Sequence, residues 1–146
     1  EALVEAQKLG YAEADPTSDV EGWDSAVKAA IMANLFFGAK IKITDVSRQG
    51  ITKITREDVL KAKNEGKRIK LIAEVKRQGN DVIASVSPHL IPMTHPLGNV
   101  MGPTNALTIA TDHLGEVTII GPGAGRIETG QALLSDMLAI HRFKNA

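Results

Sequence analysis

The feature that most constrains the fold is a pair of alternating apolar and polar runs, residues 68–77 and 81–88, that meet at Gly79-Asn80. Alternation with a period of two predicts β-strands, and a two-residue connection of glycine and asparagine predicts a tight antiparallel hairpin. A second pair of apolar runs, residues 106–111 and 117–120, flanks His113-Leu114-Gly115. The sequence therefore predicts two antiparallel hairpins.

Helical patterns are mixed with these strands along the chain. Residues 23–37 lack glycine and proline and place apolar side chains close to helical spacing, so we expect a helix there. Thr55 is expected to cap a helix over residues 56–64, a further helix is expected over residues 127–140, and residues 40–44 are expected to form a short edge strand. This order predicts an α+β fold with a mixed, largely antiparallel sheet covered by helices on one face, a two-layer α/β sandwich.

Length and composition fit one ordinary globular domain. The 17 basic and 17 acidic side chains leave no basic surface for nucleic acid or an anionic membrane. Cysteine is absent, which excludes disulfides and thiolate zinc sites and fits a reducing cytoplasm. No apolar run approaches the roughly 18 residues of a membrane span. We expect a cytoplasmic protein with no nucleic-acid or membrane partner.

The N-terminus predicts either a piece of a longer protein or a processed chain. Residues 3–10 have the pattern of the last turns of a helix that ends at Gly10, and the chain begins without methionine. The 146 residues are too few for a catalytic domain together with a complete dinucleotide-binding domain. We expect residues 1–146 to form a single domain.

An acidic stretch, residues 11–28, is the most informative part of the chain. Residues 11–22 are expected to be a loop with four carboxylates and no basic side chain, and such a loop is most often a solvated surface. Asp24 and Lys28 are four apart on the expected helix, so they share a face and can form an ion pair. An EF-hand calcium site is excluded, because a register with Gly22 at the sixth position puts Lys28 at the twelfth, where a glutamate is required. The four histidines lack metal-ligand spacing, so no metal site is expected.

Eleven positions in and before this stretch have a specific spacing: Ala6, Gly10, Tyr11, Ala12, Asp15, Pro16, Asp19, Val20, Gly22, Asp24 and Lys28. At this spacing they resemble the signature of the homoserine dehydrogenases. Other segments look like the catalytic domain of the same family: Ser87-Pro88, His95-Pro96-Leu97, Asn105 and the run Gly121-Pro122-Gly123-Ala124-Gly125. The resemblance implies a catalytic and dimerisation domain without its N-terminal nucleotide-binding domain.

The resemblance implies roles for five side chains. Lys28 matches the lysine implicated in proton transfer, and Asp24 matches its acidic neighbour. Glu13 matches the glutamate that binds the substrate amino group, Asp19 resembles a further acidic substrate-site residue, and Tyr11 resembles a residue whose backbone lines the pocket. The implied substrates, L-homoserine and L-aspartate 4-semialdehyde, carry an α-ammonium group that several carboxylates would hold.

The implied reaction is reversible hydride transfer between the substrate and NAD or NADP, in threonine, methionine and isoleucine biosynthesis. A dinucleotide-binding fold usually carries Gly-x-Gly-x-x-Gly between a strand and a helix, and only residues 121–126 come close. Arg126 occupies the third glycine position, so the residues alone favour a tight turn. The resemblance implies that Gly123 and Ala124 touch a cofactor bound mainly by the missing domain.

A second interpretation is a binding or dimerisation module that has no catalysis of its own. The expected sheet has one face to bury after helices cover the other, and the resemblance implies that this face pairs with a second subunit as a homodimer. A homologue with another substrate is disfavoured by Glu13, Asp24 and Lys28. His95 is given no role, because a lone histidine beside a proline turn is usually structural or exposed.

Overall fold

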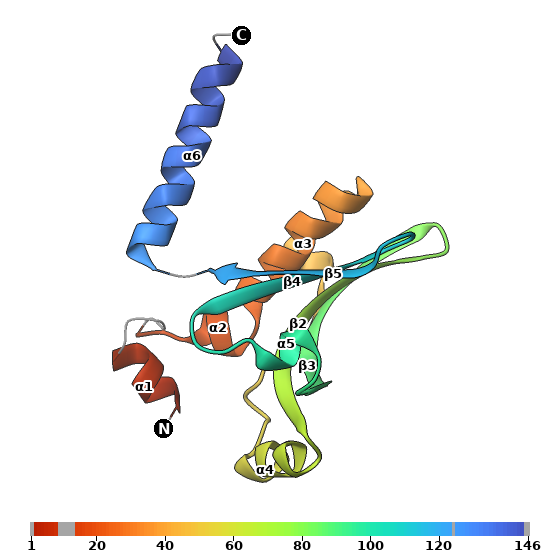
Figure 1. The fold of residues 1–146 in the computed structure, drawn as a ribbon, viewed down its shortest axis with the longest axis vertical. Helices are drawn as coiled ribbons and strands as arrows, with labels where there is room; N and C mark the ends of the chain where they lie inside the picture. The colour runs from red at the N-terminus through yellow and green to blue at the C-terminus, as the bar shows by residue number, and fades with distance from the viewer. Residues whose placement is uncertain (1, 9–13, 124, 145–146) are drawn as a thin grey trace. The chain divides into compact units, whose positions relative to one another are not determined.

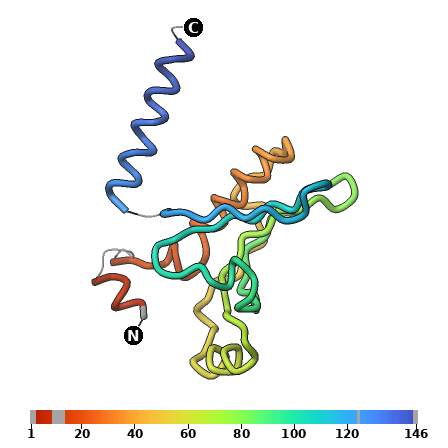
Figure 2. The backbone as a smooth tube through the Cα atoms, viewed as in Figure 1, coloured from red at the N-terminus to blue at the C-terminus, as the bar shows by residue number. Residues whose placement is uncertain are grey.

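The structure is a computed structural model that describes residues 2–8, 14–123 and 125–144 (Figure 1). The chain separates into two compact units, Glu1–Gly98 and Asn99–Ala146. The first unit contains the acidic stretch and a three-stranded sheet, and the second contains a two-stranded sheet and the C-terminal helix. Figure 2 follows the backbone through the same elements from the N-terminus to the C-terminus.

The sheet of the first unit is built on the predicted hairpin. Strand β2 (Lys67–Gln78) pairs antiparallel with strand β3 (Asp81–Pro92) along its whole length, and Gly79-Asn80 closes the turn. The hairpin is therefore confirmed, with both strands longer than the sequence indicated. A two-residue strand, β1 (Ser47–Arg48), pairs in parallel with β3, with Ser47 opposite Ser85, which gives the strand order β1-β3-β2.

Helix α3 (Trp23–Phe37) has the predicted bounds and packs against β2 and β3. The side of α3 that packs on the sheet is made of alanines, whose single methyl groups let the helix approach the strands closely. Alternate residues of a strand face the same side, so the sheet meets this helix with every second residue. The buried cluster consists of Ala26, Ala29, Ala30, Val46, Ala84 and Val86.

The edge strand expected over residues 40–44 is wrong. The chain instead forms a short 3-10 helix, η1 (Ile43–Asp45), just before β1. The Ile41 N–H donates a hydrogen bond to Asn34 Oδ1 at 2.9 Å, and Asn34 Nδ2 donates to the Ile41 carbonyl at 3.1 Å. The Lys42 N–H donates to Asp45 Oδ2 at 2.9 Å. Side chains thus satisfy backbone groups that a strand partner would otherwise bind.

Helix α4 (Arg56–Asn64) begins at the predicted cap. The Asp58 N–H donates to Thr55 Oγ1 at 3.2 Å, and the Thr55 N–H donates to Asp58 Oδ2 at 2.9 Å. This reciprocal pair is a capping box, which satisfies N–H groups that the first turn of a helix leaves without partners. The helix predicted over residues 56–64 is confirmed.

Three shorter helices lie within the first unit or at its C-terminal end. Helix α1 (Ala2–Lys8) confirms the N-terminal helix, while its expected cap, Gly10, lies outside the described residues. Helix α2 (Thr17–Val20) lies within the acidic stretch, so the expectation of a loop up to Gly22 is wrong there. Helix α5 (Pro96–Asn99) follows β3. One helical turn was missed because four residues are too few to show a periodicity.

The second unit contains the second predicted hairpin. Strand β4 (Thr104–Thr111) pairs antiparallel with strand β5 (Gly115–Pro122), and helix α6 (Arg126–Lys144) follows the glycine-rich turn and extends beyond its predicted end. The α+β class is confirmed, with one mixed three-stranded sheet and one antiparallel two-stranded sheet. Among the described residues, no helix has the length and apolar character to cross a membrane.

Candidate functional site

The described part of the acidic stretch begins with a turn at Asp15. The Thr17 hydroxyl donates a hydrogen bond to Asp15 Oδ1 at 2.6 Å, and the Thr17 backbone N–H donates to the same oxygen at 3.1 Å. These bonds lower the pKa of Asp15, because they stabilise the carboxylate. Helix α2 starts from this turn and carries Asp19, which is exposed. Asp15 is thus engaged in the local turn, whereas Asp19 faces solvent.

Gly22 joins α2 to α3 and fixes the direction in which α3 begins. Its φ of 76° lies in the left-handed region, which glycine adopts without steric cost. A β-carbon at this position would lie 3.2 Å from Val86 Cγ1 and 3.5 Å from Leu71 Cδ2. The backbone at Gly22 therefore sits directly on the sheet and anchors the first turn of α3.

Asp24 and Lys28 form an ion pair on the first two turns of α3. Lys28 Nζ lies 2.7 Å from Asp24 Oδ2, and the side chains are 52% and 54% exposed. The pair that the four-residue spacing predicts is present. An exposed pair of this kind contributes only about 0.3–0.5 kcal/mol to stability. Because both side chains are about half exposed, a solute can reach the Lys28 ammonium beside α2.

Arg48, which the sequence analysis missed, lies against the same junction. Its guanidinium carbon is 3.8 Å from the centroid of the Trp23 ring. Its Nη1 donates a hydrogen bond to the Glu21 carbonyl and lies 3.7 Å from Glu21 Oε2. No local pattern signals this contact, because Arg48 follows Glu21 by 27 residues and belongs to a strand of only two residues.

The sequence and the fold both match one family. The model of the family described as homoserine dehydrogenase matches residues 1–138. The chain belongs to the homoserine dehydrogenase family. One relative, the NAD(+)-dependent homoserine dehydrogenase of Pseudomonas canavaninivorans, is 48% identical over 143 residues, which cover 97% of this chain and 41% of the relative.

Solved homoserine dehydrogenases have the same fold. The enzyme from Thiobacillus denitrificans matches with a TM-score of 0.91 and 40% identity, over 98% of this chain and 33% of that one. The S. aureus enzyme at pH 6.5 matches with a TM-score of 0.89 and 44% identity, over 97% of this chain and 36% of that one. The chain thus spans about a third to two fifths of the length of its homoserine dehydrogenase relatives.

The structure brings together only part of the site that the homoserine dehydrogenase signature predicts. Asp19, Asp24 and Lys28 lie in the first unit, on two helices that meet at Gly22. Gly123 lies in the second unit. The remaining predicted site residues lie outside the described ranges: Tyr11, Glu13 and Ala124. The described core of the site is therefore the α2–α3 junction.

Two side chains lie against the glycine-rich turn before α6. The side chain of Asn105 lies where a β-carbon of Gly123 would stand. The carboxylate of Glu128 lies where a β-carbon of Gly125 would stand, at the start of α6. A helix N-terminus attracts anions, and the Glu128 carboxylate of this chain lies beside Gly125, immediately before α6. Both contacts favour the tight-turn interpretation of residues 121–126.

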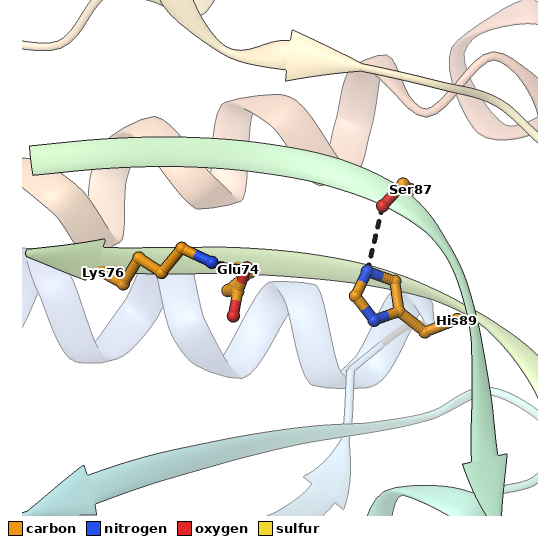
Figure 3. Close-up of polar contacts among 4 residues, drawn as sticks. All are labelled: Glu74, Lys76, Ser87 and His89. Carbon is orange, nitrogen blue, oxygen red and sulfur yellow. Dashed lines mark hydrogen bonds and ion pairs between the residues drawn. The ribbon is translucent and has the colours of Figure 1, made fainter. Parts of the chain in front are cut away.

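The face of the β2–β3 sheet away from α3 carries polar side chains (Figure 3). Ser87 Oγ lies 3.0 Å from His89 Nε2, and Lys76 Nζ lies 3.0 Å from Glu74 Oε2. A nucleophilic triad needs a carboxylate that orients the imidazole. Glu74 is paired with Lys76, so this arrangement does not provide a serine-histidine-carboxylate triad. The pairs are typical of a polar sheet face.

Proposed function

We propose that the complete gene product interconverts L-aspartate 4-semialdehyde and L-homoserine with NAD or NADP, and that this chain supplies the substrate-binding and catalytic residues. The reaction would serve threonine, methionine and isoleucine biosynthesis. The observation that carries the proposal is the accessible Lys28–Asp24 pair, 2.7 Å apart, at the signature positions of a homoserine dehydrogenase family member.

Lys28 is proposed to act at the C4 oxygen of the substrate. In the reductive direction a nicotinamide cofactor, when bound, would supply a hydride to C4, and negative charge would develop on the aldehyde oxygen. A lysine ammonium at that oxygen stabilises the charge and donates the proton that completes the alcohol. Asp24 holds the lysine side chain from one helical turn away, as the 2.7 Å contact between them supports.

The acidic side chains are proposed to bind the α-ammonium group of the substrate. Glu13 and Asp19 would contact this group, and the backbone of Tyr11 would line the pocket. The exposure of Asp19 on α2 supports this role. Asp15 is not assigned to the substrate, because its carboxylate accepts two hydrogen bonds from Thr17.

The nicotinamide cofactor is proposed to be bound mainly by a domain outside this chain, and residues 1–146 to act as one catalytic domain. The name of the Pseudomonas relative supports a nicotinamide cofactor. The chain's coverage of about two fifths of that relative supports a separate nucleotide-binding part. Gly123 and Ala124 are proposed to touch only the edge of the cofactor, since Asn105 and Glu128 crowd the turn.

The active form is proposed to be a cytoplasmic homodimer that pairs through the sheet face opposite α3. Ile83, which pairs with Lys76 and lies on this face, is 38% exposed, and burial of such an apolar side chain against a second subunit would be favourable. Size-exclusion chromatography with light scattering tests the dimer. A strict monomer at high protein concentration would contradict it.

Kinetics of the complete gene product test the catalytic roles. Lys28→Ala is expected to lower kcat by about 100-fold or more, the usual contribution of a positioned proton donor. Lys67→Ala is a matched control, because Lys67 also forms an exposed ion pair, 3.1 Å from Glu65. Unchanged turnover in the Lys28 variant would refute the proton-transfer role.

Glu13→Ala tests the binding role separately. This substitution is expected to raise KM for homoserine with a smaller effect on kcat, because an amino-group contact far from C4 binds substrate and transition state alike. Glu57→Ala, on α4, is a control acid outside the site. A Glu13 variant with the wild-type KM would remove Glu13 from the substrate site.

A further inference from the structure

Residues 47–51, the segment that follows η1, connect the α2–α3 junction to the sheet through backbone hydrogen bonds. Strand β1 runs along β3, and the Gln49 N–H continues this pairing by donating to the Val86 carbonyl at 2.8 Å. Two residues later the Ile51 N–H donates to the Val20 carbonyl, at the end of α2, also at 2.8 Å. One short segment therefore contacts both the sheet and the helix that carries Asp19.

The approach between this segment and the junction is close. A β-carbon at Gly50 would collide with the Val20 carbonyl and with the Cα of Glu21. No residue other than glycine fits here without a backbone shift. The backbone at Gly50 therefore lies in direct contact with the backbone at Val20 and Glu21. Arg48, two residues before Gly50, contacts the same junction.

Arg48 contacts the junction on both sides of Gly22. Its guanidinium donates to the carbonyl of Glu21, which precedes Gly22, and stacks at 3.8 Å on the ring of Trp23, which follows it. The Arg48 side chain is only 22% exposed. A planar guanidinium can stack on a ring and donate hydrogen bonds at once, whereas a lysine ammonium is a compact point charge.

We propose that Arg48 is a positioning residue that fixes the angle between α2 and α3, and with it the placement of Asp19 relative to the Asp24–Lys28 pair. The inference rests on the proposed function. Glycine has the widest range of allowed backbone torsion angles, so a small rotation at Gly22 would change the angle between α2 and α3. A displacement of 1 Å in a catalytic arrangement can lower a rate by about 100-fold.

The test compares Arg48→Gln and Arg48→Lys in the complete gene product. Arg77→Gln is the matched control, because Arg77 also lies over an aromatic ring of α3, 5.9 Å from the centroid of Phe37, but at the other end of the helix. Arg48→Gln is expected to lower kcat/KM for homoserine about ten-fold, with KM for the nucleotide unchanged. Arg48→Lys should recover part of the loss, and Arg77→Gln should match the wild type.

A purely structural role gives a different result. It would lower the melting temperature and the folded fraction but leave kcat and KM for homoserine, per folded enzyme, at their wild-type values, and this outcome would overturn the proposal. Hydrogen exchange provides a readout that needs no activity. The amides of residues 19–26 should exchange faster in Arg48→Gln and not in Arg77→Gln.

The two readouts separate this proposal from the proposed function. A folded wild-type protein that does not oxidise homoserine contradicts the proposed function. Exchange in residues 19–26 still decides whether Arg48 restrains the junction: faster exchange in Arg48→Gln supports the restraint, and unchanged exchange overturns it.

Discussion

Replacing Gly22 with alanine should destabilise the first unit by about 3 kcal/mol, as the sum of a backbone cost and a packing cost. The φ of 76° at Gly22 is a left-handed conformation, which costs an L-residue about 1–2 kcal/mol. The added methyl group would lie 3.2 Å from Val86 Cγ1, and Val86 is 1% exposed, so it has little room to move. Overpacking of this kind costs about 1–3 kcal/mol, slightly offset by the lower entropy of the unfolded alanine chain.

Gly38→Ala separates the two costs. Gly38 has a φ of 62° at the C-terminal end of α3, and among the described residues no atom lies within 4 Å of an added β-carbon. The Gly38→Ala variant should therefore lose free energy of unfolding only through the backbone cost, about 1–2 kcal/mol. The difference between the two variants measures how tightly the junction is seated on the sheet.

Urea unfolding followed by the fluorescence of Trp23 provides the measurement. Trp23 is the only tryptophan of the chain and follows Gly22 directly, so its signal reports the unit that contains α3. We expect a lower midpoint for Gly22→Ala than for Gly38→Ala at an equal slope. Equal midpoints would refute the anchoring of α3 by Gly22.

Two further predictions concern hydrogen bonds at helix starts. Thr55→Ala should lower the free energy of unfolding by about 1 kcal/mol through the loss of the α4 cap. Thr52→Ala is the control and should not lower it. Equal stability of the two variants in urea would contradict the cap. Folding lowers the pKa of Asp15, so its hydrogen bonds stabilise the folded chain above the unfolded value of 3.8 and this contribution is lost as the pH falls through the lower folded value. Thr17→Val should raise the pKa of Asp15 in an NMR titration, with Ser18→Ala as the control, and an unmoved titration would show that Thr17 does not hold the carboxylate.

The elements that sequence predicts are those set by local patterns. The bounds of α3 follow from an uninterrupted helical spacing, and the β2–β3 hairpin follows from alternation around Gly79-Asn80. The strand expected over residues 40–44 failed for a non-local reason. Asn34, one turn before the end of α3, binds the backbone of Ile41, and no periodicity within the segment reveals that partner.

The same distinction applies to the site. The Asp24–Lys28 pair follows from a spacing of four on one helix, and the structure contains it. The junction is held by contacts between residues far apart in the chain. Gly22 lies against Val86, and the Arg48 guanidinium lies over the Trp23 ring. Such contacts depend on how the sheet and helix pack, which a single sequence does not encode in any short pattern.

The most direct test of the proposed homoserine dehydrogenase activity is the formation of reduced nicotinamide, measured by its absorbance, when L-homoserine is added with NAD or NADP. The complete gene product and the 146-residue chain alone should be assayed side by side. We expect homoserine-dependent reduction by the complete product, loss of this reduction in Lys28→Ala, and no reduction by the chain alone. A folded complete product that reduces neither nucleotide in the presence of homoserine would contradict the proposed activity.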